Sequence, residues 1–392
     1  MILKEQLSPT WKRVLLRDAV EFLDYLRRPV TKIDRTDGQY PYYGANGQQG
    51  TIDNFIFDEP LILLAEDGGN FGQEGRTVAY KIEGKCWVNN HAHVLRPKPN
   101  VDINFLLRHL EYYDVTPYIT GTTRGKLTKD AASRIELVLP PLPEQKRVAA
   151  ILDKADSIRR KRQEAVLMIE ELLRSVFLDM FGDPVTNPKG WKEAALTDVA
   201  EIVSGVTKGR NFDDKQTVLA PYLRVANVQD GYLNLSEIKE IEVLPTDIAK
   251  YRLLDGDILL TEGGDPDKLG RGTVWRTHIE DCIHQNHIFR VRIKTDNLLP
   301  DFLSVLIGSE RGKRYFLRAA KQTTGIASIN STQLKNFPLL IPPLDLQQRF
   351  ANCVVGSQKL KKRLNKTETT TDTLFTSLLQ RAFKGELLID NQ

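Results

Sequence analysis

Two short polar clusters carry side chains suited to recognising bases. Asparagine and glutamine can each form two hydrogen bonds with an adenine in the major groove of DNA, and a histidine beside them can add another contact. The same side chains could instead form a buried polar network that fixes a strand, and the sequence leaves both interpretations open. The clusters are Asn89, Asn90 and His91, and Gln285, Asn286 and His287.

Two loops combine threonine, glycine and basic residues, which can donate hydrogen bonds to phosphate oxygens. They read "YITGTTRGKLTKD" from Tyr118 and "RAAKQTTGIASINS" from Arg318. We expect Arg124, Lys126 and Lys321 to contact nucleic acid through these loops. The alternative is an ordinary solvated loop.

Metal binding and catalysis are not supported by the spacing of reactive residues. Cys86 lies near His91 and His93, but in the second set the histidines follow Cys282 at different distances, and no fourth ligand pair is nearby. We find neither an N-P-P-[YF] adenine-methylation motif nor a G-x-x-x-x-G-K-[ST] phosphate loop. The sequence therefore predicts a non-catalytic protein that binds no metal or cofactor of its own.

The elements that position these residues are written twice along the chain. "LVLPPLPEQKRVAAILDKAD" from Leu137 matches "LLIPPLDLQQRFANCVVGSQ" from Leu339, and the run from Trp11 matches the run from Trp191. Further matches, "ILLAEDGG" with "ILLTEGGD" and "CWVNNHAHVLR" with "CIHQNHIFRVR", follow in the same order. Conserved order with a slowly growing offset indicates two copies of one unit.

Each copy has a β-rich region of short branched and aromatic runs, followed by one long helical pattern. The sequence predicts an α+β fold in which two pseudo-symmetric β-rich domains are separated by two long antiparallel coiled-coil helices. The predicted boundaries are 1–140 and 184–340 for the domains and 141–183 and 341–392 for the helices. The apolar positions expected at the helix seam include Val148, Ile151, Ala155, Ile158, Ile169, Leu172, Val176, Phe350, Cys353, Leu360, Leu374 and Leu378.

Composition agrees with an ordinary globular protein. The 392 residues are 41% hydrophobic and 27% charged, with a formal net charge of +4 that permits a nucleic-acid partner. No apolar run approaches the length of a membrane span, and the first residues do not form a signal peptide. We therefore expect a cytoplasmic protein. The basic run Arg159–Arg162 is expected to be a solvated helix face, or a contact to DNA or to a partner.

The paired Pro-Pro-Leu junctions, the long helices and the two divergent copies resemble the specificity subunit of type I restriction–modification enzymes over nearly the whole chain. The second junction departs from the pattern at Asp345 and Leu346, where the first has Pro143 and Glu144. The resemblance implies that each domain is a target-recognition domain that reads one half of a bipartite site in double-stranded DNA. It further implies that the helices set the gap between the half-sites.

Partner subunits also follow from the resemblance. Two modification subunits, which bind S-adenosylmethionine and methylate adenine, would dock on the helices, and restriction subunits that use ATP and Mg would join them. Two other classes remain as alternatives: an enzyme with built-in recognition domains, such as a fused methyltransferase or nuclease, and a coiled-coil scaffold that binds only proteins.

Overall fold

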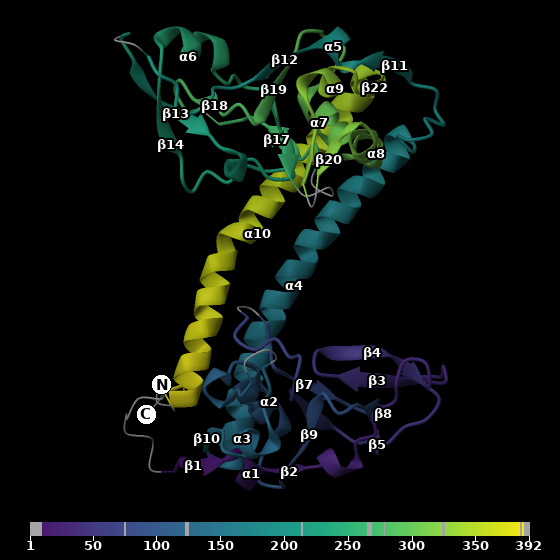
Figure 1. Cartoon of the computed structure of the whole chain (residues 1–392), viewed down its shortest axis with the longest axis vertical. Coiled ribbons are helices and arrows are strands. Elements are labelled where there is room, and N and C mark those ends of the chain that lie inside the picture. Colours follow the sequence, from purple (N-terminus) through teal and green to yellow (C-terminus); the bar gives the residue numbers. More distant parts are fainter. Residues whose placement is uncertain are drawn as a thin grey trace. The chain divides into compact units, whose positions relative to one another are not determined.

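A computed structural model of the chain describes residues 10–387, apart from 74–75, 122–124, 213–214, 265–268, 278, 324–325 and 385; the side chains of 321–323, 326, 367–370 and 384 are also not described. The chain forms two compact units. Unit 1 is Met1–Glu164 with Asn365–Gln392, and unit 2 is Ala165–Leu364. Each unit holds one β-rich domain and half of each long helix, α4 (Leu142–Phe181) and α10 (Leu344–Lys384) (Figure 1).

The β-rich domain of unit 1 has two four-stranded sheets, ordered β2-β9-β6-β7 and β4-β3-β8-β5, and a separate β1-β10 pair. The strands are β1 (Lys12–Leu15), β2 (Val20–Phe22), β3 (Tyr40–Gly44), β4 (Gly47–Ile52), β5 (Phe57–Asp58), β6 (Leu61–Ala65), β7 (Ala79–Ile82), β8 (Lys85–Val88), β9 (Ala92–Pro97) and β10 (Glu136–Leu139). The short helices are α1 (Leu16–Ala19), α2 (Ile103–Glu111) and α3 (Lys129–Ser133), with 3-10 turns η1 (Asp24–Leu26) and η2 (Thr116–Tyr118).

Unit 2 has sheets ordered β12-β19-β15-β17, β14-β13-β18 and β16-β21-β20, and the separate pair β11-β22. The strands are β11 (Lys192–Ala195), β12 (Ala200–Ser204), β13 (Val218–Leu223), β14 (Lys239–Val243), β15 (Ile258–Thr261), β16 (Gly263–Gly264), β17 (Gly272–Val274), β18 (Ile283–His284), β19 (Ile288–Ile293), β20 (Lys321–Thr323), β21 (Ile326–Ser328) and β22 (Pro338–Ile341). The helices are α5 (Leu196–Val199), α6 (Pro245–Tyr251), α7 (Pro300–Gly308), α8 (Glu310–Ala319) and α9 (Ser331–Lys335), with the 3-10 turn η3 (Val225–Asn227).

The two domains share one topology, which confirms the predicted duplication. The sheet β2-β9-β6-β7 has the same strand order as β12-β19-β15-β17, and β1-β10 corresponds to β11-β22. In both second sheets one strand pairs antiparallel with its hairpin partner and parallel with a later strand, as β3 does with β8 and β13 with β18. The central strands β6 and β15 are buried along their whole length, as expected for continuous apolar runs covered on both faces.

The repeated Pro-Pro-Leu junction is held by a buried glutamine in each copy. Gln145 accepts a hydrogen bond from Asp102 N (2.8 Å) and donates to the carbonyl oxygens of Asn100 (3.0 Å) and Pro140 (2.8 Å). Gln347 makes the same three bonds, accepting from Leu299 N (2.9 Å) and donating to Asn297 O (2.9 Å) and Pro342 O (2.7 Å). One carboxamide thus ties the strand end and the long helix to the start of an earlier helix, which is α2 in unit 1 and α7 in unit 2.

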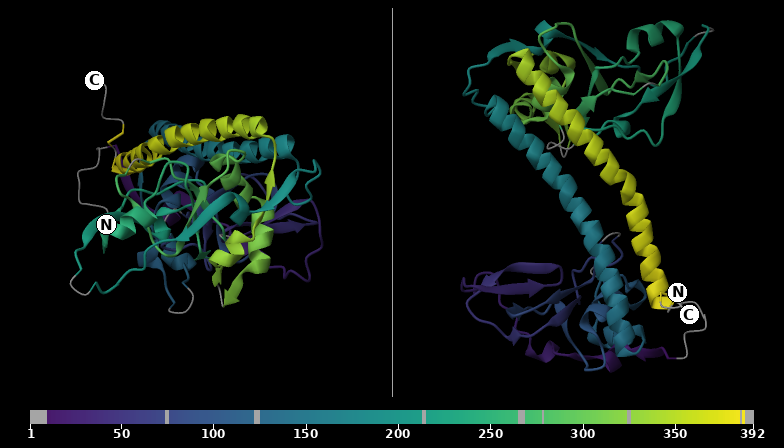
Figure 2. Two further views of the ribbon diagram at one scale, coloured as in Figure 1. Left: turned by 90° about the horizontal axis from the view of Figure 1, so that it is seen from above. Right: turned by 180° about the vertical axis from the view of Figure 1, so that it is seen from behind.

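The long helices run antiparallel within each unit, as predicted. In unit 1 the beginning of α4 packs on the end of α10, where the Arg159 guanidinium lies 4.8 Å from the Phe375 ring centre. Figure 2 shows the two helices side by side. In unit 2 the end of α4 packs on the beginning of α10, where the Phe177 and Phe350 rings are 5.4 Å apart. Lys361 and Glu170 form an ion pair at 2.7 Å in the same unit.

The predicted seam was wrong at several positions. The side chains of Ile158, Leu172, Leu360 and Leu374 are exposed, as are those of Ile151 and Cys353. The buried stripe of α4 instead passes through Leu152, Asp156 and Arg162 before it reaches Phe177. This stripe contains charged residues. A search for apolar positions alone therefore misses it and selects neighbouring apolar residues that are exposed.

The basic run in α4 is partly structural. Arg159 and Arg160 both pair with the buried carboxylate of Asp156, at 2.9 and 2.8 Å, and Arg108 reaches the same carboxylate at 3.0 Å. Arg162 is buried. These contacts exclude a uniformly solvated face for the run.

In the part of the chain that the structure describes, we find no helix with both the length and the apolar character needed to cross a bilayer.

Candidate nucleic-acid interface

One edge of the central sheet in unit 1 holds a histidine–carboxylate pair. β6 and β9 are antiparallel with Ala65 opposite Ala92, so the residues after β6 lie opposite the residue before β9. There Nδ1 of His91 lies 2.5 Å from a carboxylate oxygen of Asp67. The imidazole is 38% exposed. It is therefore both fixed in orientation and accessible.

Unit 2 places a second pair at the equivalent edge. Thr261 of β15 lies opposite Ile288 of β19, and His287 directly precedes β19. Nδ1 of His287 lies 2.6 Å from a carboxylate oxygen of Glu262, and the imidazole is 56% exposed. Of the candidate residues, the two histidines are thus the ones brought to matching positions with matching partners.

The amides beside the histidines differ in how free they are. Asn89 is buried, and its side chain donates to Gln49 Oε1 (3.1 Å) and accepts from His91 N (2.8 Å). The side chain of Asn89 thus takes part in the buried polar network that the sequence left open as the alternative, and a base contact by Asn89 stays a prediction. Asn90 is exposed, while Gln285 and Asn286 are half-buried and held through their backbone N–H groups by Leu223 O and Val206 O.

Two of the basic candidates, Lys126 and Lys321, lie in hairpins beside these edges. Lys126 forms backbone bridges with Thr120 and Asp67, and its ammonium pairs with Glu66 at 3.1 Å while remaining 46% exposed. In unit 2, β20 carries Lys321, whose side chain lies outside the described residues, as does the whole of Arg124. The prediction that Arg124 and Lys321 contact DNA stays a prediction.

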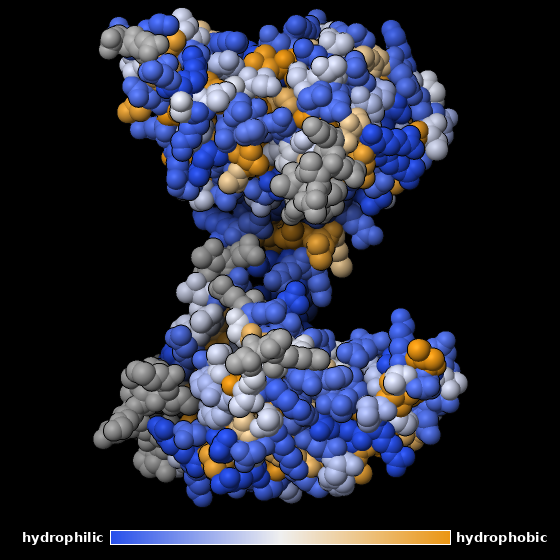
Figure 3. Space-filling model, in the orientation of Figure 1, coloured by the Kyte–Doolittle hydropathy of each residue, from blue (hydrophilic) through white to orange (hydrophobic). Residues whose placement is uncertain are grey.

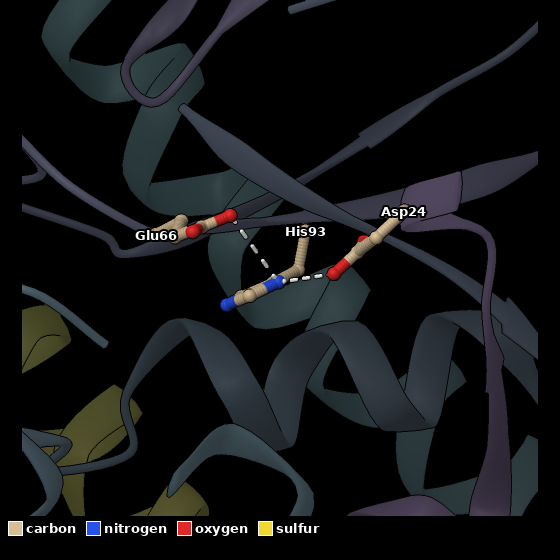
Figure 4. Close-up of side chains that lie close together, drawn as sticks. All are labelled: Asp24, Glu66 and His93. Carbon is tan, nitrogen blue, oxygen red and sulfur yellow. Dashed lines mark hydrogen bonds and ion pairs between the residues drawn. The ribbon is translucent and has the colours of Figure 1, made fainter. Parts of the chain in front are cut away.

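A buried polar network in unit 1 could be mistaken for a metal site. Asp24, Glu66 and His93 are the one group of three potential ligands found among the described residues (Figure 4). Nδ1 of His93 lies 2.6 Å from Asp24, and Nε2 lies 2.8 Å from the Leu127 carbonyl oxygen. Both ring nitrogens therefore already have an oxygen of the protein as neighbour.

The charges of this network are balanced by cations. Arg27 Nη1 pairs with Glu66 at 2.7 Å, and Lys126 binds the same carboxylate. Burial alone raises the pKa of Asp24, but the hydrogen bond and charge of His93 outweigh it and hold that pKa below its ordinary value. We conclude that the cluster is a structural ion network. In the second copy, Phe289 stands at the position that the repeat matches to His93.

The cysteines are also structural. Cys86 and Cys282 are buried, and burial raises the pKa of their thiols to about 11 and about 12. Since the thiolate is the form that binds metal, these positions favour packing over coordination.

Sequence reasoning missed the two carboxylates. Asp67 and Glu262 follow the matching runs "ILLA" and "ILLT", so an acidic residue directly after a buried strand in both copies was the available signal. This signal was weak because the carboxylate that pairs with the histidine does not occupy the same position in the two copies.

The fold and these edges define a duplicated recognition protein. It has two divergent α+β domains of one topology, each with a polar sheet edge. Both domains pack on the same pair of long helices. The model of the family described as "Type I restriction modification DNA specificity domain" matches residues 9–168 and 188–369. The chain belongs to this family. As a type I specificity subunit it is a recognition component and not the catalyst.

Individual relatives agree with this. The chain is 34% identical over 143 residues to the putative type I restriction enzyme specificity subunit S.HindORF215P of Haemophilus influenzae, a match that spans 36% of this chain and 36% of that relative. It is 21% identical over 354 residues to the EcoKI specificity subunit of Escherichia coli K12, covering 83% of this chain and 74% of the relative. The crystal structure of an S subunit from M. genitalium has the same fold, with a TM-score of 0.62, 13% identity and 98% of each chain covered.

Proposed function

We propose that each β-rich domain reads one half of a bipartite site in double-stranded DNA and that the two long helices set the gap between the halves. The observation that carries this proposal is a conserved framework with divergent surfaces. β6, β9 and the junction glutamines are repeated, whereas α6 and α8 occur only in the second domain of the described chain. One framework with two different surfaces suits a ligand with two equivalent positions and different bases.

The second domain also has a cavity of about 410 Å³. Its lining includes Tyr232, Arg271 and Lys313, which combine an aromatic face with two cations. Side chains of these types bind bases and phosphates. The cavity therefore supports DNA reading by residues that the first domain does not share.

We propose that modification subunits dock on the long helices, at an exposed apolar stretch of α4. Leu167, Met168 and Leu172 are 63–65% exposed on the part of α4 that belongs to unit 2. Figure 3 shows apolar side chains at the surface there. Three neighbouring exposed apolar side chains favour a protein contact over a solvated face.

The chemistry of the assembled enzyme would come from the partners. We propose that the modification subunits supply S-adenosylmethionine-dependent adenine methylation, and that restriction subunits use ATP and Mg. A cytoplasmic location is part of the same proposal, because the target is DNA.

The test separates domains from helices. Replacing residues 10–140 with the matching domain of another specificity subunit should change one half-site of the methylated sequence and leave the gap unchanged. Deleting seven residues from α4 (165–171) and seven from α10 (367–373) shortens each helix by ~10 Å at ~1.5 Å per residue. With a rise of about 3.4 Å per base pair, the gap should shorten by up to about three base pairs.

Both variants are assayed by methylation mapping of the complex reconstituted with modification subunits. A deletion that rewrites half-site bases, or a domain replacement that alters the gap, would show that the two roles are not separable.

A further inference from the structure

The histidine–carboxylate pairs occupy equivalent places in the two copies. The N–H of Glu66 donates to His91 O (2.9 Å), and the N–H of Glu262 donates to His287 O (3.0 Å). The carbonyl oxygens of the same two glutamates accept from Leu127 N (2.7 Å) and Ile329 N (2.9 Å). These matching backbone bonds make Glu66 and Glu262 equivalent positions of the fold.

The carboxylate that holds the histidine comes from a different position in each copy. In unit 2 it is Glu262 itself. In unit 1 Glu66 is taken by Arg27 and Lys126, and Asp67, one residue later, pairs with His91 instead. The residue after Glu262 is Gly263, which has no side chain to offer. The pairing has therefore been retained although the residues that make it have changed.

Stability does not account for this retention. Both imidazoles are more than one-third exposed, and an exposed ion pair contributes only about 0–1 kcal/mol to stability. Each carboxylate fixes Nδ1, which leaves Nε2 as the second ring nitrogen; in unit 2 the amide Nδ2 of Asn286 lies 3.5 Å from Nε2 of His287. The exposed side of each ring is therefore the side that a ligand of the domain can reach.

We propose that His91 and His287 are equivalent, sequence-independent contacts to DNA phosphate, one at each half-site, and that neither reads a base. This inference rests on the proposed function. Bases differ between half-sites, so residues that read them should diverge between the copies. A geometry that both copies keep should bind what the half-sites share, which is the sugar–phosphate backbone.

The neighbouring backbone agrees with this role. Asp67 is bridged to Lys126, and Gly263 pairs with Ser328, so in each copy the pair lies beside a hairpin strand with polar or basic residues. In unit 1 this neighbour is a lysine that keeps nearly half of its surface exposed. Lysine and serine are both common donors to phosphate oxygens.

The experiment uses the complex with modification subunits and measures its affinity for a cognate duplex and for an unrelated duplex across salt concentrations. His91→Ala and His287→Ala should each weaken both affinities by a similar factor, about tenfold for a charge-assisted hydrogen bond. Each should also lower the slope of log affinity against log salt. The methylated sequence should not change. Asn54→Ala and Ser236→Ala, which change exposed, uncharged residues outside the candidate set, serve as controls, for which we expect no change in the salt slope.

A second arm locates the contact. Single phosphates of the cognate duplex are replaced by neutral methylphosphonates. One position in each half-site should weaken binding by the wild-type complex, with no further loss in the variant that lacks the corresponding histidine.

Three results would overturn the inference: relaxed bases in one half-site, loss of modification subunits without loss of DNA affinity, or unchanged affinity with a lowered melting temperature. If the wild-type complex itself shows no preference for any duplex, the proposed function fails first.

Discussion

The carboxamides of Gln145 and Gln347 each satisfy three backbone groups at the place where a strand turns into a long helix. Both side chains are fully buried. Replacement by alanine leaves one N–H and two C=O groups without partners, and a buried unsatisfied group costs about 1–3 kcal/mol. We therefore expect Gln145→Ala and Gln347→Ala each to lower the free energy of unfolding by about 2–3 kcal/mol.

The effect should be local to one unit. Gln145 belongs to unit 1 and Gln347 to unit 2, so hydrogen exchange should show faster opening in residues 10–164 for the first variant and in 165–364 for the second. Arg13→Ala, an exposed position on β1, is the control. Equal opening of both units in either variant would contradict this assignment of the glutamines.

Two buried histidines make stability depend on pH. Burial lowers the pKa of His109 and of His284 from 6.5 to about 4. Between these values the unfolded chain binds protons that the folded chain does not. Stability is then complete above pH 6.5 and falls as the pH drops towards 4, by up to about 1.4 kcal/mol per pH unit for each histidine.

His109→Leu removes this titration in unit 1, where the His109 ring packs against Phe383. Between pH 7 and pH 5 the free energy of unfolding should fall less for the variant than for the wild type. The measurement is urea unfolding with a signal that reports on unit 1. An unchanged pH dependence would mean that His109 is not the titrating group.

At the scale of single residues, the sequence predicted the places but not the partners. The histidines of both polar clusters lie at equivalent edges, yet Asn89 is buried and the carboxylates that hold the rings were not expected. Which side chains meet across two strands depends on the register of the strands. In unit 1 the histidine pairs with Asp67, one residue after Glu66, which is the position equivalent to Glu262. The glutamine of each junction could have been recognised, because both Pro-Pro-Leu motifs keep it, together with the arginine two residues later.

At the scale of elements, the repeat predicted the shared topology and the antiparallel helices, but the apolar rhythm misplaced the seam. Leu152 is buried in the core of unit 1, whereas Ile158, two turns later, is half exposed. Leu152→Ala should cost about 2–5 kcal/mol. Ile158→Ala should stay within about 0.5 kcal/mol of the wild type. Both variants are compared by urea unfolding. A larger loss of stability for Ile158→Ala than for Leu152→Ala would support the helix seam that the sequence predicted.

The seam was misplaced for a physical reason. Asp156 is buried because Arg108, Arg159 and Arg160 surround its carboxylate, and a charge satisfied in this way can occupy a core position. Periodicity treats it as a surface residue. The partners of Asp156 come from α2 as well as from α4, so the sequence of one helix could not reveal them.

At the scale of the whole molecule, the exposed part of α4 should matter for assembly and not for folding. Leu172→Asp adds a charge at a position that is 63% exposed. We expect its melting temperature to stay within about 2 °C of the wild type, while co-purification with modification subunits weakens. Glu171→Asp, also exposed, is the matched control. Full assembly of Leu172→Asp would place the docking surface elsewhere.

Unit 1 is discontinuous in the chain, whereas unit 2 is one uninterrupted segment. Phe375, Leu379 and Ala382 belong to the same buried core as Val148 and Leu152. During translation the ribosome must therefore finish all of unit 2 before the first domain can close its core. At about 5–20 residues per second, the roughly 200 intervening residues take at least about ten seconds. Throughout that time the nascent first domain lacks the part of α10 that covers its core, so we expect slow translation or a premature stop within α10 to favour aggregation of the first half of the protein.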